Sequence, residues 1–427
     1  MLLQVVIFSS LFLYLSISKR FYNFDFTKHL STKNLYPIES DTAPSADVPE
    51  SCGLVQLHLV ARHGARNPSI DDVKELDVLD TLFANVPIVK DWRNPFSQSQ
   101  ASLLTQRGEH ELYLLGKRSR KRHPKFWGNI TYNPNVIEFR SSERSRSGQS
   151  GIAYSLGLFE GYGKLGESML QPVYIHTTPA SQDKELLTHH ICPLWVNTIK
   201  YSPAFEKQKK IFLHTYLSKI AERLSNRFGM RPPLKPIHVD YIYRACSYAV
   251  SYSGSTDTWC SLLEEDDFLK LEYFHDMEKY YTFSYGSPLN TKLACKLYTS
   301  LVKSVDTFLE GKSSLKSVLK FAHAETIIFV TTMLGLYKDD YPLEADRFYQ
   351  SKSREFRTSN IAPFASNVYF EIYNCTNKYE TTIYVQMLVN EKPVVIPGCG
   401  YTFCLWDRFK QLLGNNIDCD FDRICQS

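Results

Sequence analysis

Residues 54–68 read LVQLHLVARHGARNP, and this stretch decides the fold class. Its first part, LVQLHLVA, has the length and the β-branched, apolar content of a buried strand. The strand runs straight into a turn that contains Gly64 and Pro68, residues that permit and stiffen tight backbone turns. In α/β folds, ligands bind where a strand ends in such a turn. We therefore predict an α/β fold with a ligand site at this turn.

The same turn carries one imidazole between two guanidinium groups, because Arg62 and Arg66 flank His63. Arginine binds phosphate oxygens through paired hydrogen bonds. An imidazole beside such a phosphate can attack the phosphorus, since the arginines neutralise its charge. The alternative is a solvated basic turn without a function. The position of the turn directly after a buried strand favours the catalytic interpretation.

Two further predicted strands end in polar residues. The strand at 136–141, VIEFRS, leads into a basic segment that contains Arg140, Arg144 and Arg146. The strand at 317–322, SVLKFA, leads into His323-Ala324-Glu325. Taken singly, the first segment is typical of a surface charge run and the second of a structural histidine. Together with the turn after residue 61, these two segments form the pattern that carries the resemblance described below.

The remaining pattern predicts alternating α/β structure interrupted by helices. A helix is expected at 102–122, whose basic C-terminal end suits the helix dipole, and amphipathic helical segments at 205–228. Further strands are expected at 172–176 and 367–375, and a hairpin at 382–397 with its turn at 390–392. We predict an α/β catalytic domain built from 25–185 and 310–427, with a mostly α-helical domain, 186–309, inserted between the two segments.

Length and charge exclude several classes of protein. The 427 residues exceed the usual size of a single domain. With 49 Lys+Arg against 45 Asp+Glu, the net charge is +4, which is too weak to indicate a nucleic-acid-binding protein. Hydrophobic residues make up 43% of the chain, enough for a large core, which excludes disorder for the bulk of the chain.

The cysteines and the N-terminus predict an oxidising compartment. The chain has 10 cysteines, an even number with no CxxC spacing, which favours disulfides over zinc or thioredoxin-like sites. Residues 1–18 are apolar and uncharged and end in a plausible cleavage site after Ser18, as in a signal peptide. The alternative is a membrane anchor, which the following Lys19 and Arg20 support; only then would the membrane be a partner. Two sequons, at Asn129 and Asn374, are possible glycosylation sites.

The motifs together resemble the histidine acid phosphatase superfamily, whose signature is RHGxRxP followed much later by His-Asp or His-Ala-Glu. The chain carries the His-Ala-Glu form within AHAETI, 322–327, and therefore resembles the multiple inositol polyphosphate phosphatases of that superfamily. The similarity extends from about residue 25 to the C-terminus. It includes the segments HLSTKNLY at 29–36, IAPFASN at 361–367 and NEKP at 390–393.

The resemblance implies a phosphoglycerate-mutase-like sheet flanked by helices, with a basic cleft at the C-terminal ends of its central strands. It implies that His63 is the nucleophile that becomes phosphohistidine and that Glu325 is the general acid. It assigns the phosphate-binding role to Arg62, Arg66, Arg144 and His323. No metal or other cofactor is expected, because arginines supply the positive charge that a metal supplies elsewhere.

The implied substrates are small inositol polyphosphates, phytate among them, and 2,3-bisphosphoglycerate by resemblance alone. The alternatives are a broad-specificity histidine acid phosphatase or phytase, and a catalytically inactive secreted binding protein on the same fold. The presence of both His63 and Glu325 argues against the inactive form. Ala65 stands where this branch often has Thr. The ending DRICQS differs from a KDEL-like retention signal, so we expect a secreted protein, or one in the lumen of the secretory or endolysosomal pathway.

Five disulfides are expected, and three of the pairs can be assigned. Cys399 and Cys404 lie on either side of a short turn, and Cys246 and Cys260 flank the loop at Gly254. The resemblance to phytases suggests the pair Cys52–Cys375. It leaves the pairing of the other four cysteines open: Cys192, Cys295, Cys419 and Cys425.

Overall fold

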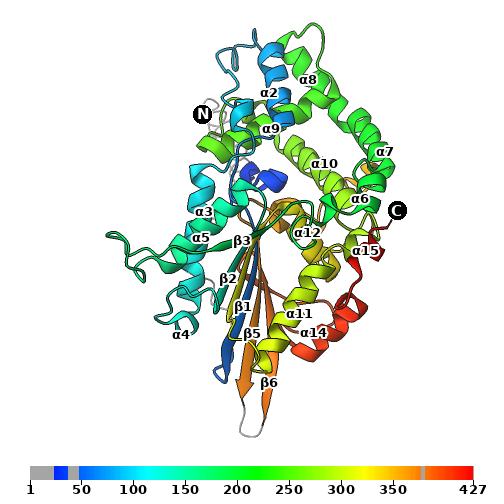
Figure 1. Ribbon diagram of the computed structural model, residues 1–427. Helices are drawn as coiled ribbons and strands as arrows, with labels where there is room; N and C mark the ends of the chain where they lie inside the picture. Colours follow the sequence, from blue (N-terminus) through cyan, green and yellow to red (C-terminus); the bar gives the residue numbers. More distant parts are fainter. Residues whose placement is uncertain (1–23, 37–47, 377–379, 427) are drawn as a thin grey trace, which may run out of the picture.

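The computed structural model describes residues 24–36, 48–376 and 380–426, so the predicted signal peptide at 1–18 lies outside the described residues. A mixed sheet with the strand order β3-β2-β4-β1-β5-β6-β7 forms the centre of the molecule, and β8 pairs with β6 (Figure 1). The strands are β1 (Cys52–Arg62), β2 (Ile137–Ser142), β3 (Ile175–Thr178), β4 (Ser317–Ala322), β5 (Asn367–Thr376), β6 (Thr381–Val389), β7 (Lys392–Val394) and β8 (Phe403–Leu405).

The middle of the sheet brings three carboxyl ends of strands together. β1 runs parallel to β4, with Arg62 opposite Ala322, and β4 runs parallel to β2, with Phe321 opposite Ser141. β5 lies on the other side of β1 and is antiparallel to it. Because parallel strands end at the same edge of a sheet, the residues after β1, β2 and β4 converge there. The predicted α/β fold class is confirmed.

Helices surround the sheet and extend beyond this edge. The α-helices are α2 (Ile70–Leu82), α3 (Gln106–Arg122), α4 (Pro124–Trp127), α5 (Ser145–Phe159), α6 (Pro193–Thr198), α7 (Pro203–Phe212), α8 (Ser218–Phe228), α9 (Pro236–Ser253), α10 (Glu265–Phe283), α11 (Cys295–Leu309), α12 (Ala324–Met333), α13 (Thr358–Ile361), α14 (Trp406–Leu413) and α15 (Phe421–Ile424).

One face of the sheet is covered by α3 and α5, which approach each other unusually closely. A Cβ on Gly116 would lie 2.1 Å from the Tyr154 carbonyl oxygen, and one on Gly157 would lie 1.9 Å from that of Tyr113. Only glycine fits at such contacts. This helix pair and the sheet enclose one hydrophobic core. The two helices also contact the loop that follows β1, so their tight packing positions that loop.

The second, larger core joins the other face of the sheet to the helical segment. Figure 1 shows α11 and α14 beside the sheet, and α7 to α10 above the edge where β1, β2 and β4 end. α2 belongs to this upper group, since it packs against α9. The segment from 193 to 309 contains only helices among its regular elements.

Several elements differ in detail from the sequence-based expectation. The helix expected at 102–122 begins only at Gln106, because the Thr105 hydroxyl caps it by accepting from the Gly108 N–H. The segment 205–228 is divided into α7 and α8 by a π-helical turn at Leu213–Leu217. The strand expected at 172–176 begins at Ile175. The hairpin is present, and its turn places Asn390 and Glu391 in the left-handed region.

Five disulfides link the described residues, and they include the three expected pairs. The other two are Cys192–Cys425 and Cys295–Cys419, which tie the C-terminal segment to the helices. Asn129 is exposed, whereas Asn374 is half-buried on β5, between β1 and β6. No helix in the described ranges is long and apolar enough to cross a membrane.

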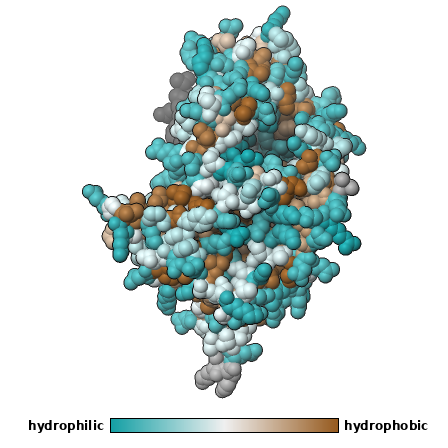
Figure 2. Space-filling view, viewed as in Figure 1, coloured by the Kyte–Doolittle hydropathy of each residue, from teal (hydrophilic) through white to brown (hydrophobic). Residues whose placement is uncertain are grey.

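A projecting segment at 160–171 follows α5 (Figure 1). An antiparallel bridge between Leu165 and Leu170 holds it together. Figure 2 shows apolar side chains gathered along it; Leu165 and Met169 are about half exposed.

Candidate active site

Two helices hold the loop after β1 through its backbone. The Ala65 N–H donates to the buried Glu111 carboxylate on α3 at 2.8 Å, and the Ala65 carbonyl accepts from the Thr105 N–H and hydroxyl. The Gly64 N–H donates to the Ser150 hydroxyl of α5 at 3.2 Å. A Cβ on Gly64 would lie 2.2 Å from the Gly108 carbonyl oxygen. The glycine in the RHG sequence is therefore required for this contact with α3.

The position of His63 fixes its tautomer. Its Nδ1 lies 2.8 Å from the Gly64 carbonyl oxygen. Because a carbonyl oxygen can only accept, Nδ1 carries the proton and Nε2 keeps its lone pair. Burial lowers the pKa of His63 well below its usual value, and the charges of Arg62 and Arg146 lower it further. The imidazole is therefore neutral, the form that can act as a nucleophile.

Arg62 and Arg66 lie beside this imidazole, and each has an N–H group without a hydrogen-bond partner among the described residues. Arg62 donates from Nη1 to the carbonyl oxygens of Thr32 and Ala362, and its guanidinium stacks 4.3 Å from the centre of the Phe364 ring. Arg66 donates from Nη1 to the Asn67 carbonyl at 2.7 Å. The Nε atoms of both arginines are buried without a partner among the described residues. Burial and the charge of Arg66 lower the pKa of Arg62 to about 9. Both guanidiniums can therefore bind an anion.

The segment after β2 places its three arginines differently. Arg140 forms an ion pair with Glu138 of the same strand. Arg144 is the N-cap residue of α5 and is exposed. Arg146 is half-buried, with a buried Nε that has no partner in the described part of the chain. Its positive charge lowers the pKa of both His63 and His323. Arg146 therefore belongs to the site, and the phosphate-binding role that the resemblance assigns to Arg144 stays a prediction.

The residue after β4, His323, meets His63 edge to face, with ring centroids 5.5 Å apart. A chain of hydroxyls sets its tautomer. Ser147 donates to the Ala322 carbonyl oxygen and Ser142 donates to Ser147, so the Ser142 oxygen accepts from His323 Nε2 at 2.8 Å. Nε2 therefore carries the proton. Burial and Arg146 lower the pKa of His323 well below its usual value.

Glu325, in the first turn of α12, is the carboxylate of the site. Burial by itself would raise its pKa. The positive charge of Lys279 on α10, with the neighbouring His189 and His323, outweighs burial and holds the pKa at about 2. The carboxyl group is thus ionised and lies in the electrostatic field of the same cations that would attract a phosphate.

The structure thus brings His63, Arg62, Arg66, His323 and Glu325 to one edge of the sheet, with Arg144 on its exposed rim. Sequence reasoning missed three contributors: Lys279, His189 and Glu111. A lysine or glutamate in a helix carries no local signal, and the pair His189-His190 stands outside any motif. Among the described residues, no group of three or more His, Cys, Asp or Glu side chains is arranged to hold a metal ion.

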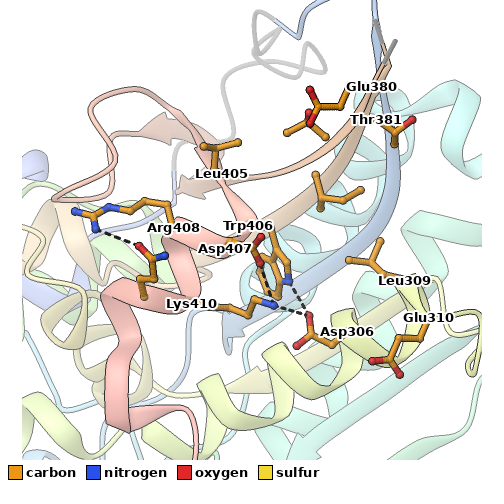
Figure 3. Close-up of a pocket in the computed structure, with 13 residues that line it drawn as sticks. Asp306, Leu309, Glu310, Glu380, Thr381, Leu405, Trp406, Asp407, Arg408 and Lys410 are labelled. Carbon is orange, nitrogen blue, oxygen red and sulfur yellow. Dashed lines mark hydrogen bonds and ion pairs between the residues drawn. The ribbon is translucent and has the colours of Figure 1, made fainter.

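A separate cavity of about 710 Å³ lies at the opposite edge of the sheet (Figure 3). Its lining includes Thr381, the first residue of β6, which pairs with Thr376 at the end of β5. Asp306 of α11 joins Trp406 and Lys410 of α14 there, at 2.8 and 3.4 Å. Because β1 begins at this edge and His63 follows its other end, this cavity is not part of the site.

Comparison with known proteins agrees with this geometry. The profile of the Histidine phosphatase superfamily (branch 2) matches residues 53–390. The chain is 29% identical over 434 residues to multiple inositol polyphosphate phosphatase 1 of Dictyostelium discoideum, covering 88% of this chain and 68% of the relative. It is 26% identical over 405 residues to a thiamine-repressible acid phosphatase of Schizosaccharomyces pombe, covering 88% and 84%.

The fold is also found among solved structures. A multiple inositol polyphosphate phosphatase of Bifidobacterium longum, in complex with inositol hexasulfate, superposes with a TM-score of 0.73 at 16% identity, covering 91% of this chain and 98% of that chain. The family profile spans most of the chain and includes His63, Glu325 and the arginines between them. The chain therefore belongs to the histidine phosphatase superfamily (branch 2), and its sequence is similar to those of multiple inositol polyphosphate phosphatases.

Proposed function

We propose that this protein hydrolyses phosphomonoesters of inositol polyphosphates, phytate among them, through a phosphohistidine on His63. The observation that carries the proposal is the tautomer of His63. Its Nδ1 proton is directed to the Gly64 carbonyl, which leaves the Nε2 lone pair free beside the unpartnered donors of Arg62 and Arg66. A nucleophile next to cations that can bind phosphate is suited to phosphoryl transfer.

In the first step, Nε2 of His63 forms a bond to phosphorus while the bond from phosphorus to the ester oxygen breaks. The guanidiniums of Arg62, Arg66 and Arg144 hold the non-bridging oxygens, and Arg146 adds positive charge. His323 joins them by taking up a second proton on Nδ1 when the phosphate dianion binds, because its Nε2–H is directed to Ser142. The departing oxygen takes a proton from Glu325, because an inositol alkoxide is a poor leaving group.

The low pKa of Glu325 is compatible with this role. It reflects Lys279, His189 and His323 in the site without substrate. A bound phosphate dianion places negative charge beside Glu325 and offsets the charge of Lys279, so the pKa of Glu325 rises when substrate binds. In the second step the ionised carboxylate takes a proton from water, whose oxygen attacks the phosphohistidine. The bond from phosphorus to Nε2 breaks, and inorganic phosphate leaves.

A second candidate is a broad-specificity acid phosphatase. The similarity to the acid phosphatase of Schizosaccharomyces pombe, at 26% identity, favours it nearly as much as the 29% identity to the Dictyostelium enzyme favours the first. The ratio of kcat/KM for phytate to that for p-nitrophenyl phosphate separates the two. A ratio well above one supports the inositol polyphosphate phosphatase, and a ratio well below one supports the acid phosphatase. Activity on 2,3-bisphosphoglycerate is a further part of the first proposal.

Secretion, or residence in the lumen of the secretory or endolysosomal pathway, is the location that the five disulfides support, because such bonds persist in oxidising compartments. For the domain organisation, we propose that the helical segment 186–309 forms a domain of its own. It contributes Lys279 and His189 to the electrostatics of the site.

The decisive experiment incubates the purified protein with phytate and resolves the products by the number and position of their phosphates. Release of lower inositol phosphates by the wild type, and its loss in His63→Ala, is the expected result. A wild-type protein that leaves phytate intact would overturn the proposed substrate, and a fully active His63→Ala variant would overturn the proposed mechanism.

A further inference from the structure

We propose that Lys33 binds a second phosphate of the substrate, one that is not being cleaved. This inference rests on the proposed function and identifies a specificity residue for the same site. Lys33 ends the 3-10 helix η2 (Ser31–Lys33), which contacts α9, α10 and α13. Figure 1 shows this N-terminal segment between the upper edge of the sheet and the helices above it.

The backbone next to Lys33 is part of the support of the phosphate-binding loop. The Thr32 carbonyl oxygen accepts from Nη1 of Arg62, so the chain at Lys33 is fixed relative to that guanidinium. The Lys33 ammonium lies 5.4 Å from the centre of the Tyr248 ring. Burial alone would lower the pKa of Arg66, but the charges of Tyr248 and Asp72 outweigh burial and raise it. Lys33 therefore lies beside the reacting site.

Asp72, the acidic residue whose charge acts most strongly on Lys33, makes its hydrogen bonds to other partners. Asp72 accepts from Nη1 of Arg244 at 2.8 Å, from the Tyr248 hydroxyl at 2.7 Å, and from the N–H and hydroxyl of Ser69. No described residue has a carboxylate oxygen within 4.0 Å of Lys33 Nζ, the distance limit for an ion pair. Lys33 is nevertheless only half-buried. Its charge is thus held near the site by the protein without being neutralised by a direct ion pair.

A cation at this place, near Asp72 but without a direct ion pair, has a cost, which indicates a function. Burial lowers the pKa of Lys33 to about 8, against the nearby charge of Asp72, so the charged form is disfavoured by its surroundings but persists at neutral and acidic pH. A residue that only filled space here would be better apolar. The reacting phosphoryl group has three non-bridging oxygens, and the guanidiniums of Arg62, Arg66 and Arg144 suffice to hold them. A further cation fits another phosphate on the same ring.

Inhibition of p-nitrophenyl phosphate hydrolysis tests this with two probes, inorganic phosphate and myo-inositol hexasulfate. In Lys33→Met, we expect the Ki of the hexasulfate to rise about tenfold or more, the effect of losing one charge-assisted contact. The Ki of inorganic phosphate should rise much less, by a factor smaller than one third of the factor for the hexasulfate. Lys33→Arg keeps the charge and should restore most of the hexasulfate affinity. Lys74→Met is the matched control, because Lys74 on α2 is largely exposed.

Three results would overturn the inference: no inhibition of the wild type by the hexasulfate, equal changes in both Ki values, or a wild-type Ki in Lys33→Met. If Lys33→Met unfolds at the assay temperature, Lys33→Gln, which keeps a polar side chain, is measured in its place. Phytate hydrolysis by the wild type is followed in parallel. If the wild type hydrolyses phytate and the hexasulfate Ki is unchanged in Lys33→Met, only the proposed role of Lys33 is refuted. If the wild type does not hydrolyse phytate but the hexasulfate Ki rises in Lys33→Met, the proposed substrate is refuted and the second anion site is retained.

Discussion

The imidazole rings of His63 and His323 lie edge to face with their centroids 5.5 Å apart. Each ring directs one N–H to a fixed acceptor, the Gly64 carbonyl for His63 and the Ser142 hydroxyl for His323. Each is buried among positive charges that lower its pKa. The site therefore holds two neutral imidazoles beside several cations, and the Nε2 lone pair of His63 is left free to attack phosphorus.

Removal of Arg146 should shift the pH profile. The charge of Arg146 lowers the pKa of His63, so Arg146→Gln should raise it toward the ordinary value. Protonation then removes the nucleophile at a higher pH, and the acid limb of kcat/KM for p-nitrophenyl phosphate should move to higher pH. Arg140→Gln is the control, since Arg140 pairs with Glu138. An acid limb that stays in place in Arg146→Gln would contradict this role.

The loss of Arg144 should affect every substrate alike. If its exposed guanidinium closes on the phosphoryl group, Arg144→Ala lowers kcat/KM for phytate and p-nitrophenyl phosphate by the same factor. That factor is roughly 10–100, the effect of one charge-assisted hydrogen bond. Steady-state kinetics on both substrates checks this, again with Arg140→Ala as the control. Unchanged kinetics in Arg144→Ala would leave Arg146 as the only phosphate ligand from this segment.

Glu325→Gln should separate the two substrates, because only one of them needs a proton. An alkoxide leaves slowly without protonation, whereas p-nitrophenolate leaves readily. Phosphoryl transfer from phytate should slow by roughly 10²–10⁴, and transfer from p-nitrophenyl phosphate far less. Single-turnover measurements isolate this step from the later hydrolysis of the phosphohistidine. Equal losses on both substrates would show that Glu325 is not the general acid.

Glu111→Gln should change the pH dependence of stability. Burial raises the pKa of the Glu111 carboxyl to about 7, against the hydrogen bond from the Ala65 N–H. The folded state therefore keeps a proton that the unfolded chain loses, and this group destabilises the fold as pH rises from about 4.5 to 7. The loss is of the order of 3 kcal/mol. Denaturant unfolding at pH 5 and pH 7 should show a smaller decrease in Glu111→Gln; an identical decrease in both proteins would refute the assignment.

The parts of the site that lie next to strands could be predicted from the sequence. β1 and β4 are mostly apolar, with the length and content of strands, so their ends before His63 and His323 are visible in the sequence. Parallel pairing then brings those ends together. The disulfides that close short segments, such as Cys246–Cys260, were also predictable, because a spacing of 14 residues limits where the partners can lie.

Contacts made by the helices could not be predicted. Lys279 lies on α10, where hydrophobic periodicity describes only the packed face, so nothing local marks its proximity to Glu325. Glu111 reaches Ala65 only because Gly64 and Gly108 let the loop and α3 touch. The bond Cys192–Cys425 spans 233 residues, a distance over which spacing carries no information. Which of Arg144 and Arg146 faces the site depends on where α5 begins. The sequence has an arginine at both positions, so it does not decide between them.

Trapping the phosphorylated enzyme tests the role of His63. The protein is mixed with labelled phytate or aryl phosphate, denatured in base within one turnover, and digested for peptide mapping. We predict a base-stable, acid-labile phosphoryl group at a stoichiometry approaching about one per chain, located on His63 and absent from His63→Ala. An active wild-type enzyme that forms no adduct, or one whose adduct lies on another residue, would contradict the proposed mechanism.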